Sequence, residues 1–395
     1  MHRRHRTWAV TAVMALTVSA GCSESTTAEE PPRGGPVPSP SDASTSETSS
    51  GSSSSGPSST EPSGSTTNRP VRSGGVRLAE AVAEKLHTPW DVDFLPDDSA
   101  LVTLRDSGEV LRIDDDGTTK LDAGGEGGAV EGVQHQNEDG LLGLAIGPDN
   151  GIYMYLTTES DNRIVRYTLR GDDLVDPEVI LDGIPTNETH SGGRLAFGPD
   201  GYLYVTTGDA RDLDLPQDTS SLAGKILRLT TSGDPAPGNP FDNEVFSYGH
   251  RNVQGIGWTS DGTMYASEFG SQKYDEINRI EPGGNYGWPH IEGWADDSDY
   301  INPLVTWTTD EASPSGIAVT DDGIWMTALR GERLWYVPIE ATGDLGTPQD
   351  HQLDLGRLRA VTMSPDDDLW VVTSNTDGRG DPSATDDQIV RLEVD

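Results

Sequence analysis

Six stretches of the chain share a turn sequence followed by alternating apolar and polar residues. They read FLPDDSALVTL from Phe94, IGPDNGIYMYL from Ile146, FGPDGYLYVTT from Phe197, WTSDGTMYASE from Trp258, VTDDGIWMTAL from Val319 and MSPDDDLWVVT from Met363. The aligned aspartates lie at positions 97, 149, 200, 261, 321 and 366. Pro-Asp-Gly favours a tight turn, and the alternation indicates a strand. The pattern therefore predicts six repeats, each with a turn leading into a strand.

A second apolar run follows each of these segments, and five of the six runs contain an apolar-x-Arg-apolar sequence. The runs are VLRID from Val110, IVRYT from Ile164, ILRLT from Ile226, INRIE from Ile277, LWYVP from Leu334 and IVRLE from Ile389. Two strands per repeat, with room for two more, are typical of a propeller blade. We expect an all-β fold, a six-bladed β-propeller of four-stranded antiparallel blades, in which a strand near residues 76–85 completes the last blade. A β-sandwich with coincidental Asp-Gly turns is the alternative.

The start of the chain has the pattern of a secretory signal. Three arginines precede an apolar run near residues 8–20, which is too short to span a bilayer, and Gly21-Cys22 follows. Cys22 is the only cysteine, and it stands where bacterial lipoproteins are lipidated, although Ser19 occupies a position where Leu is usual. We expect residues 1–21 to be a lipoprotein signal peptide and the protein to be extracytoplasmic, lipid-anchored to the outer face of the cell membrane. An ordinary secretory signal with a chance cysteine is the alternative.

Residues 22–74 consist mostly of Ser, Thr, Gly and Pro. Such a segment buries too little apolar surface to offset the entropy lost on ordering. We therefore expect a disordered tether over residues 22–74 and the propeller domain over residues 75–395.

The charge of the chain excludes several classes of partner. Asp and Glu number 66 against 27 Lys and Arg, which gives a formal net charge of −39. A polyanion does not bind nucleic acid non-specifically or anionic lipid through a basic surface, so we expect no nucleic acid partner and membrane contact only through Cys22. The six acids and three bases of the tether nearly cancel, and the excess therefore lies in the expected propeller.

Several residues near predicted loops suit chemistry or ligand binding. His190 opens a Gly-rich turn before a strand, and Asp209 follows that strand, a spacing that allows a carboxylate to orient a histidine. A lone histidine is often structural, so both roles remain open. Arg357 and Arg359 point to one side of a predicted strand, and with Arg251 and Arg330 (also near loops) they could bind a multiply anionic ligand. Surface arginines that neutralise acidic loops are the alternative.

The segment from residue 268 to 289 is rich in carboxylates, amides and glycines, which suit a hard cation such as Ca²⁺. Outside the predicted signal peptide, which contains His2 and His5, the sequence lacks a His-x-x-His zinc motif, and it also lacks a dinucleotide-binding Gly-x-Gly-x-x-Gly after a strand, a Walker A sequence and a Gly-x-Ser-x-Gly elbow. Several common enzyme classes therefore have no support in this sequence.

Five motifs together resemble one family. HSGGRLAFGPDGYLYVTTGD, AGKILRL, YGHRNVQGIGW, SEFGSQKYDEINRIEPGGNYGWP and GRLRAVTMSPDDDLWVVT are similar, in this order, to those of the glucose/sorbosone dehydrogenase family. The resemblance covers about Leu86 to Leu392 and is strongest to bacterial aldose sugar dehydrogenases. It implies a six-bladed propeller that uses pyrroloquinoline quinone (PQQ) and Ca²⁺ to oxidise aldoses at C1 to the lactone.

The resemblance also implies roles for individual residues. His190 matches the general base that takes the proton of the sugar C1 hydroxyl while hydride passes to the quinone. Asp209 matches the carboxylate that holds this histidine, and Arg251 matches an arginine on the substrate side. Matches to cofactor-binding positions are Glu138, Asn252, Gln254, Trp307, Arg330, Arg357 and Arg359. Matches to two calcium sites are the carbonyls of Gly270 and Ser271 for the catalytic ion, and Glu276 and Tyr286 for a structural ion.

This sequence departs from the soluble glucose dehydrogenases at Thr189, where they have Asp, and at Ser271, where they have Pro. The long loops linked to sugar specificity and dimerisation in those relatives have no counterpart in this shorter domain. We therefore expect a monomer that oxidises a broad range of small aldoses and passes electrons to an unidentified quinone or redox protein. The alternatives are a metal-dependent lactonase, which leaves the arginine pair unexplained, and a non-enzymatic carbohydrate- or ligand-binding propeller, which would not need His190 and that pair.

Overall fold

The computed structural model describes residues 74–394 of the chain. These residues belong to one compact unit, Asn68–Asp395. The predicted signal peptide (1–21), the lipidated Cys22 and nearly all of the predicted tether (22–74) lie outside the described residues.

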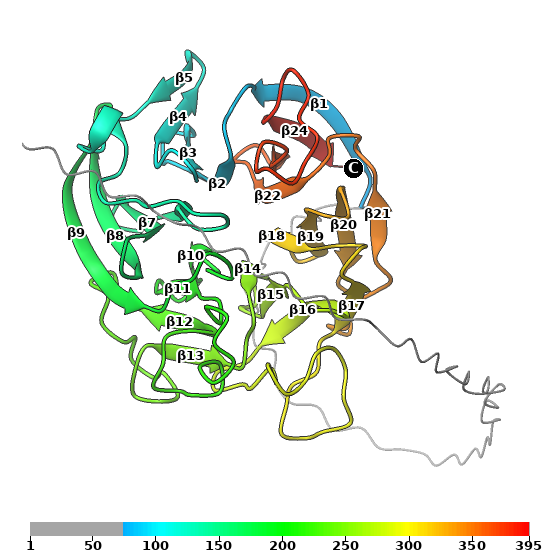
Figure 1. The fold of residues 1–395 in the computed structure, drawn as a ribbon. Coiled ribbons are helices and arrows are strands. Elements are labelled where there is room, and N and C mark those ends of the chain that lie inside the picture. The colour runs from blue at the N-terminus through cyan, green and yellow to red at the C-terminus, as the bar shows by residue number, and fades with distance from the viewer. Residues whose placement is uncertain (1–73, 395) are drawn as a thin grey trace, which may run out of the picture. The chain divides into compact units, whose positions relative to one another are not determined.

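The prediction of a six-bladed β-propeller is confirmed. Six four-stranded antiparallel sheets surround a central channel (Figure 1). The first three blades are β2 (Pro89–Phe94), β3 (Ala100–Leu104), β4 (Val110–Asp114), β5 (Gly117–Lys120); β6 (Leu141–Ile146), β7 (Gly151–Thr157), β8 (Asn162–Arg170), β9 (Asp173–Ile184); and β10 (Leu195–Phe197), β11 (Leu203–Thr206), β12 (Lys225–Leu229), β13 (Val245–Tyr248). A single 3-10 turn, η1 (Glu126–Gly128), lies between the first two of these blades.

The remaining three blades follow the same order from the channel outward. They are β14 (Val253–Trp258), β15 (Met264–Glu268), β16 (Tyr274–Ile280), β17 (Val305–Thr308); β18 (Pro314–Val319), β19 (Gly323–Ala328), β20 (Arg333–Pro338), β21 (Gln349–His351); and β22 (Leu358–Met363), β23 (Leu369–Thr373), β24 (Ile389–Val394), with β1 (Val76–Ala83) at the outer edge. The strands β2, β6, β10, β14, β18 and β22 contact one another around the channel.

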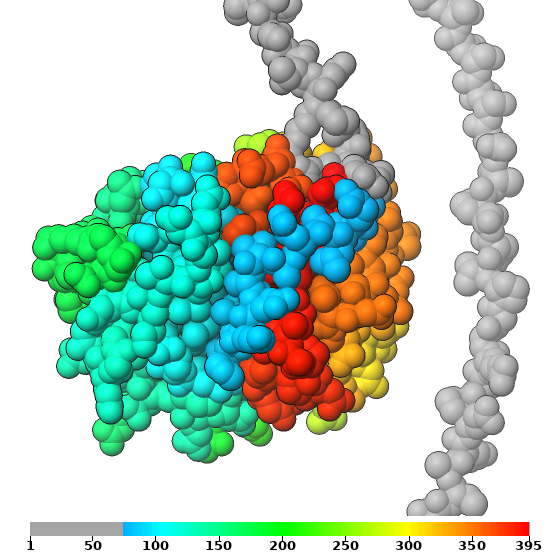
Figure 2. Space-filling model, turned by 90° about the horizontal axis from the view of Figure 1, so that it is seen from above, coloured from blue at the N-terminus to red at the C-terminus, as the bar shows by residue number. Residues whose placement is uncertain are grey.

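The ring is closed by the two ends of the described chain, as the sequence predicts. Strand β1 pairs antiparallel with β24, from Val76 opposite Val394 to Ala83 opposite Ile389. Figure 2 shows the blue N-terminal strand lying against the red C-terminal segment. The last blade therefore holds the first and last strands together without any covalent bond between them.

The six repeated turns join the first and second strands of the blades. In four of them the aspartate side chain accepts the backbone N–H two residues further on, namely Asp97 from Ser99, Asp149 from Gly151, Asp200 from Tyr202 and Asp261 from Thr263. The repeated arginine lies on the third strand and pairs with the turn aspartate in two blades, as Arg166–Asp149 (2.6 Å) and Arg228–Asp200 (2.8 Å). The repeat therefore encodes the turn and its bond to the neighbouring strand.

The core lies between neighbouring blades. For example, Tyr153 and Tyr155 on β7 pack with Leu203 and Val205 on β11, and all four side chains are buried. Within residues 74–394, no helix has the length and apolar character needed to cross a membrane. The turns between first and second strands occupy one end of the channel, so the connections that precede the inner strands and those between second and third strands gather at the other end.

Candidate functional site

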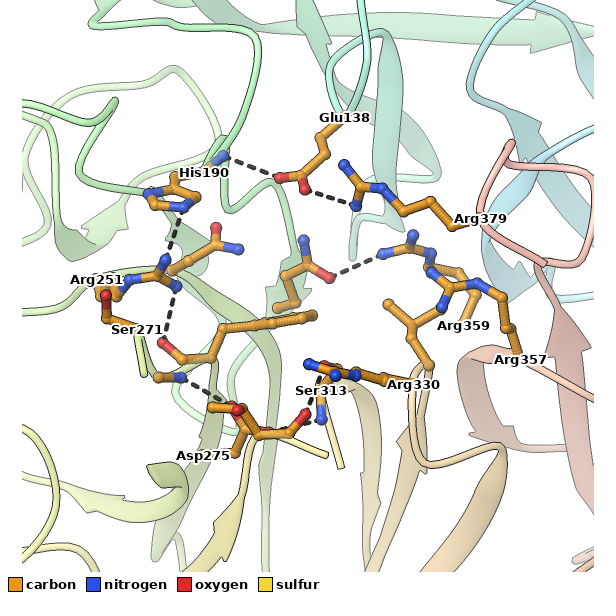
Figure 3. A pocket seen from close by; sticks show the side chains of 16 residues that line it. Glu138, His190, Arg251, Ser271, Asp275, Ser313, Arg330, Arg357, Arg359 and Arg379 are labelled. Atoms are coloured by element: carbon orange, nitrogen blue, oxygen red, sulfur yellow. Dashed lines mark hydrogen bonds and ion pairs between the residues drawn. The ribbon is translucent and has the colours of Figure 1, made fainter. Parts of the chain in front are cut away.

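A cavity of about 430 Å³ opens at the end of the channel where the inner strands begin (Figure 3). Its lining comes from five blades and from the long loops between strands. The lining residues are Glu138, His190, Arg251, Asn252, Gln254, Phe269, Gly270, Ser271, Asp275, Thr309, Ser313, Leu329, Arg330, Arg357, Arg359 and Arg379. Ten of the predicted site residues therefore meet in one cavity.

The predicted histidine–carboxylate pair is present. His190 Nδ1 lies 2.7 Å from Oδ1 of the buried Asp209, and Oδ2 of Asp209 accepts the indole N–H of Trp288 at 2.8 Å. A Cβ on Gly208 would lie 1.6 Å from the carbonyl oxygen of His190, so only glycine allows the two segments to approach this closely. The His190–Asp209 pair therefore requires a glycine at position 208 as well as its own two side chains.

The hydrogen bonds around His190 define its protonation state. Arg251 Nη2 lies 2.9 Å from His190 Nε2. A guanidinium can only donate, so Nε2 accepts and carries no proton. The ring proton then lies on Nδ1 and is donated to Asp209. His190 is thus a neutral imidazole whose basic nitrogen faces the cavity.

Burial and charge act in opposite directions on the partners of His190. Burial by itself raises the pKa of Asp209, but the hydrogen bond from His190, followed by those from the backbone N–H of Arg211 and the indole of Trp288, outweighs it and holds the pKa below its usual value. Burial lowers the pKa of Arg251, partly opposed by Asp209 and Glu268. The carboxylate therefore stays ionised beneath the histidine, and Arg251 is a desolvated cation beside it.

Two arginines of the last blade form the opposite wall of the cavity. Arg357 donates from Nη2 and Nε to Oδ2 of Asp377, at 2.9 and 3.2 Å. Arg359 Nη1 donates to Oε1 of Gln254 at 2.8 Å, and Arg359 Nη2 lies 3.9 Å from Asp377. Burial lowers the pKa of Arg359 to about 9, with the charge of Arg105 acting in the same direction. This wall therefore holds more positive charge than its one buried carboxylate neutralises.

Two buried guanidinium atoms at the cavity have no hydrogen-bond partner, Nε of Arg251 and Nε of Arg359. An unpaired buried donor is unfavourable, particularly on a charged group. Arg330 (62% exposed, 2.5 Å from Asp310) and Arg379 add two more cations at the rim. Five arginines against Glu138 and Asp275 make the cavity cationic within an acidic protein, which suits a ligand with several carboxylates.

The two amides predicted for cofactor binding fix neighbouring inner strands. Asn252 Oδ1 accepts the backbone N–H of Gly192 at 3.0 Å, which connects the loop of His190 to the next blade. Gln254 Oε1 accepts from Arg359 and from the hydroxyl of Ser315 (3.1 Å). Both line the cavity, so they hold its floor and also present polar atoms to a ligand.

The loop of Gly270 and Ser271 is held from both sides by carboxylates. Oδ1 of Asp275 accepts the N–H of Gly270 at 2.9 Å. Oε1 of Glu292 accepts four successive backbone N–H groups, from Ser271 to Tyr274, at 2.7 to 3.3 Å. Burial raises the pKa of Asp275 to about 6, opposed in part by its backbone hydrogen bonds. The backbone N–H groups from Gly270 to Tyr274 are therefore hydrogen-bonded. Gly270 and Ser271 both line the cavity.

Glu276 and Tyr286, predicted for a structural calcium site, lie beside a much smaller cavity of about 10 Å³ that Glu268 and Glu292 also line. Burial, followed by the charge of Glu268, raises the pKa of Glu276 to about 8. Across residues 74–394, no three His, Cys, Asp or Glu side chains are arranged to hold a metal ion. A cation in either predicted site would therefore need oxygen ligands besides these side chains, such as backbone carbonyls.

Trp307, predicted for cofactor binding, belongs to a hydrophobic core cluster. It lies on β17, the outermost strand of its blade, where it is buried and packs against Trp335 with ring centroids 5.6 Å apart. It does not line the cavity. Its cross-strand partner Asp275 and Thr309, two residues further on, do line the cavity, so Trp307 lies behind this part of the cavity wall and its contact with a cofactor stays a prediction.

The structure adds residues that the sequence did not single out. Arg379 lines the cavity from the long loop between β23 and β24, and Asp377 in the same loop binds Arg357. Asp275 joins the Gly270 loop to Ser313 of the next blade, whose N–H it accepts at 2.6 Å. Arg379 is one more arginine in a predicted loop and could have been grouped with the other four. No sequence signal distinguishes Asp275 and Asp377 among so many acidic residues.

Fold and site together define a propeller whose channel mouth is built to bind an anionic ligand beside a neutral histidine. The sequence profile of the Glucose / Sorbosone dehydrogenase family matches residues 86–386, and the chain belongs to this family. Its structure is similar to that of the PQQ-bound aldose sugar dehydrogenase of Streptomyces coelicolor, with 47% identity and a TM-score of 0.78 over 82% of this chain and 99% of that chain.

This chain covers different shares of two further relatives. Aldose sugar dehydrogenase YliI of Escherichia coli (strain K12) is 29% identical over 345 residues, which are 76% of this chain and 90% of that protein. Quinoprotein glucose dehydrogenase B of Acinetobacter calcoaceticus is 34% identical over 268 residues. Those residues are 56% of this chain and 54% of that enzyme, so the match spans about half of the second relative.

Proposed function

We propose that this protein is a PQQ- and Ca²⁺-dependent dehydrogenase that oxidises aldose sugars at C1 to the lactone. The observation that carries this proposal is the neutral His190, held by Asp209 and facing a cavity with five arginines. Membership of the Glucose / Sorbosone dehydrogenase family and the similarity to a PQQ-bound aldose sugar dehydrogenase support an oxidoreductase that uses PQQ.

The residues of the cavity fit PQQ, a planar quinone with three carboxylates. Arg330, Arg357 and Arg359 would hold the carboxylates, and the unpaired Nε atoms of Arg359 and Arg251 would gain an acceptor. Asn252 and Glu138 would border it from neighbouring blades. When bound, PQQ supplies the electrophile that accepts hydride from C1 of the sugar.

The residues also fit Ca²⁺ through backbone oxygens. The loop that Asp275 and Glu292 hold in place presents Gly270 and Ser271 to the cavity, and hard cations prefer such oxygen ligands. Ser271 is acceptable there because a carbonyl ligand does not depend on the side chain. Glu276 and Tyr286 remain proposed for a second, structural ion.

The chain's own contribution to the reaction is proton transfer and charge balance. His190 Nε2 takes the proton of the C1 hydroxyl, and the ionised Asp209 stabilises the imidazolium that forms. Arg251 donates to the same nitrogen in this structure, so the substrate hydroxyl must replace this bond before transfer. Arg251 can then donate a hydrogen bond to the substrate. This bond keeps the substrate within reach of His190.

From the sequence alone we propose a monomer that is anchored through lipidated Cys22 outside the cell membrane. A small aldose is the substrate, and a quinone or redox protein receives the electrons. No nucleic acid is a partner.

The test is reconstitution of the purified full-length protein with PQQ and Ca²⁺, followed by reduction of an artificial dye in the presence of several aldoses. We expect dye reduction that requires a sugar, PQQ and Ca²⁺ together, and oxidation of the sugar to its lactone. PQQ binding without any sugar-dependent reduction would contradict the proposal. Hydrolysis of lactones in place of sugar oxidation would favour a lactonase.

A further inference from the structure

An ion pair joins the last blade to the second across the edge of the cavity (Figure 3). Arg379 Nη1 lies 2.7 Å from Oε1 of Glu138, and Arg379 Nη2 donates to Oδ1 of Asn137 at 2.8 Å. Glu138 precedes β6, whereas Arg379 follows β23, so the pair spans the top of the first blade. It connects two loops that are 241 residues apart in the sequence.

The same glutamate holds the backbone of His190. Oε2 of Glu138 accepts the N–H of His190 at 3.1 Å. This matters because His190 has a φ of 63°, in the left-handed region that a residue with a Cβ adopts at a cost. The amide bond to Glu138 therefore helps to keep the base in a backbone conformation that it would not adopt by itself.

Arg379 is itself held in place. Oδ1 of Asp377 accepts the N–H of Arg379 at 2.9 Å, while Oδ2 of the same carboxylate binds Arg357. A Cβ on Gly380 would lie 2.8 Å from Cδ of Arg357, so the loop packs closely against that wall of the cavity. A continuous series of contacts thus leads from Arg357 through Asp377, Arg379 and Glu138 to the amide of His190.

An exposed ion pair usually contributes little to stability. This pair differs because only 22% of the Glu138 side chain is exposed, against 45% for Arg379. Burial by itself raises the pKa of Glu138, but the charge of Arg379 and the N–H of His190 outweigh it, and the pKa lies below its usual value. Glu138 is thus an ionised carboxylate that needs Arg379 beside it.

We propose that Arg379 and Glu138 are positioning residues that set the orientation and the electrostatic environment of His190. They do so by joining the cavity wall of Arg357 and Arg359 to the loop that carries His190. The proposal rests on the dehydrogenase function proposed above. Neither residue transfers a proton. Their effect passes through the amide of His190 and through the two opposite charges near its ring.

The charges near His190 decide the expected direction of the effects. They are Asp209 and Arg211 after β11, Arg251 before β14, Glu138 and Glu188 from the neighbouring loops, and Arg379 beyond Glu138. Removing Arg379 leaves Glu138 unneutralised, which favours the protonated histidine. Removing the charge of Glu138 favours the neutral histidine. The two single variants should therefore move the pH–rate profile in opposite directions.

The experiment compares R379Q, E138Q and the double variant in the full-length protein. In R379Q we expect the rise of kcat/KM with pH to move up by about 0.3 pH unit, a shift that a charge at this range can cause. In E138Q it should move down, and in the double variant it should return close to the parent. We also expect kcat to fall about fivefold in R379Q with a smaller change in KM, and R379K to recover part of the loss.

A second measurement does not depend on activity. Hydrogen exchange of the His190 amide, followed by mass spectrometry without PQQ, should be about fivefold faster in R379Q. The control is R170Q, which removes an exposed pair with Asp176 (2.6 Å) at the outer part of the second blade and should change neither readout. Equal amide exchange in R379Q and the parent, or pH profiles that move in the same direction in both single variants, would overturn the inference. Faster exchange in a protein that oxidises no sugar would overturn the proposed function alone.

Discussion

The two ends of the central channel are built from the same six inner strands yet differ in chemistry. The end where the strands begin holds the arginine-lined cavity of about 430 Å³. The end where they finish holds a cavity of about 320 Å³. Its lining is mostly aliphatic, and only Asp91, Asp93 and Arg194 bring charge to it.

The charged groups of the second cavity bind one another and the backbone. Asp91 forms a buried ion pair with Arg194 and accepts the N–H of Leu144 at 3.1 Å. Asp93 accepts the N–H groups of Ile146 (2.9 Å) and Phe94 (2.8 Å). These carboxylates join β2 to β6, so their bonds hold the first two blades together.

Loop length explains why the two ends differ. At the second cavity the chain makes short turns, such as that between β6 and β7, which bring few side chains over the channel. At the first cavity several connections are long, such as those from β11 to β12 and from β23 to β24, which supply Asp209 and Arg379. Binding residues gather on loops that a rigid scaffold positions. The comparison predicts that variants at the first end change function and variants at the second end change stability.

His190→Ala should give the largest effect. Loss of the general base should lower kcat by about 10²- to 10⁴-fold in the reconstituted enzyme. PQQ affinity should stay close to that of the parent because His190 is neutral, whereas the melting temperature should fall, because the buried Asp209 loses one of its hydrogen-bond partners and keeps only Trp288 and the N–H of Arg211. Steady-state dye reduction and a PQQ titration followed by absorbance measure the two quantities. Turnover within threefold of the parent would show that another group accepts the proton.

Arginine-to-methionine changes at the two ends should separate stability from binding. Arg194→Met leaves Asp91 buried without its partner and should lower the free energy of unfolding by about 3–5 kcal/mol. Arg359→Met should weaken PQQ binding by about 10- to 100-fold, because a charged hydrogen bond is lost, while its neutral partner Gln254 limits the effect on folding. Urea denaturation and PQQ titration of both variants give the comparison.

The double variant Asp91→Asn/Arg194→Met is the control for that experiment. Removing both charges should recover most of the stability that Arg194→Met loses, because no charge is then buried alone. If Arg194→Met weakened PQQ binding as strongly as Arg359→Met, the functional division between the two ends would be wrong.

Asp93→Asn should give the smallest effect, visible as a change in pH dependence. Burial raises the pKa of Asp93 to about 6, so the folded protein holds more protons than the unfolded chain between about pH 4 and 6. Its contribution to stability is therefore present in acid and is lost as the pH rises through 6, by about 1 kcal/mol between pH 5 and 7. The variant should lack this loss when unfolding by urea is compared at the two pH values.

Asp97→Asn provides the matched control at an exposed turn. The hydrogen bonds from Ser99 lower the pKa of Asp97, so this carboxyl is ionised in both folded and unfolded protein above pH 5. The difference in stability between pH 5 and 7 should then equal that of the parent. An unchanged difference in Asp93→Asn as well would remove Asp93 as the source of the pH dependence.

Local patterns were sufficient to predict the architecture. The turn at Asp149 and the arginine at position 166 recur because each blade repeats the same hairpin, and their bond is formed between neighbouring strands. Alternating apolar residues fix which face of each strand is buried. The closure of the ring by β1 also followed from counting two strands at every repeat and one left over at the start.

Site residues that lie in recognisable sequence motifs could be predicted, and the other site residues could not. His190 with Asp209, and Arg357 with Arg359, lie in recognisable sequences that meet at the cavity. The position of Trp307 on the outermost strand of its blade was not predictable, because an aromatic residue by itself does not reveal whether its strand is inner or outer. Arg379 was missed because its contact with Glu138 spans most of the chain.

By itself the sequence determined the repeat, the number of blades, the acidity of the domain and the residues that could serve as base and cation. These properties depend on local turns, on alternation and on composition. Only the tertiary structure decided which cations share a cavity, which carboxylates are neutralised by them, and which nitrogen of His190 is free to accept a proton. Those properties depend on distances between residues on different blades, and such distances exist only once the ring has closed.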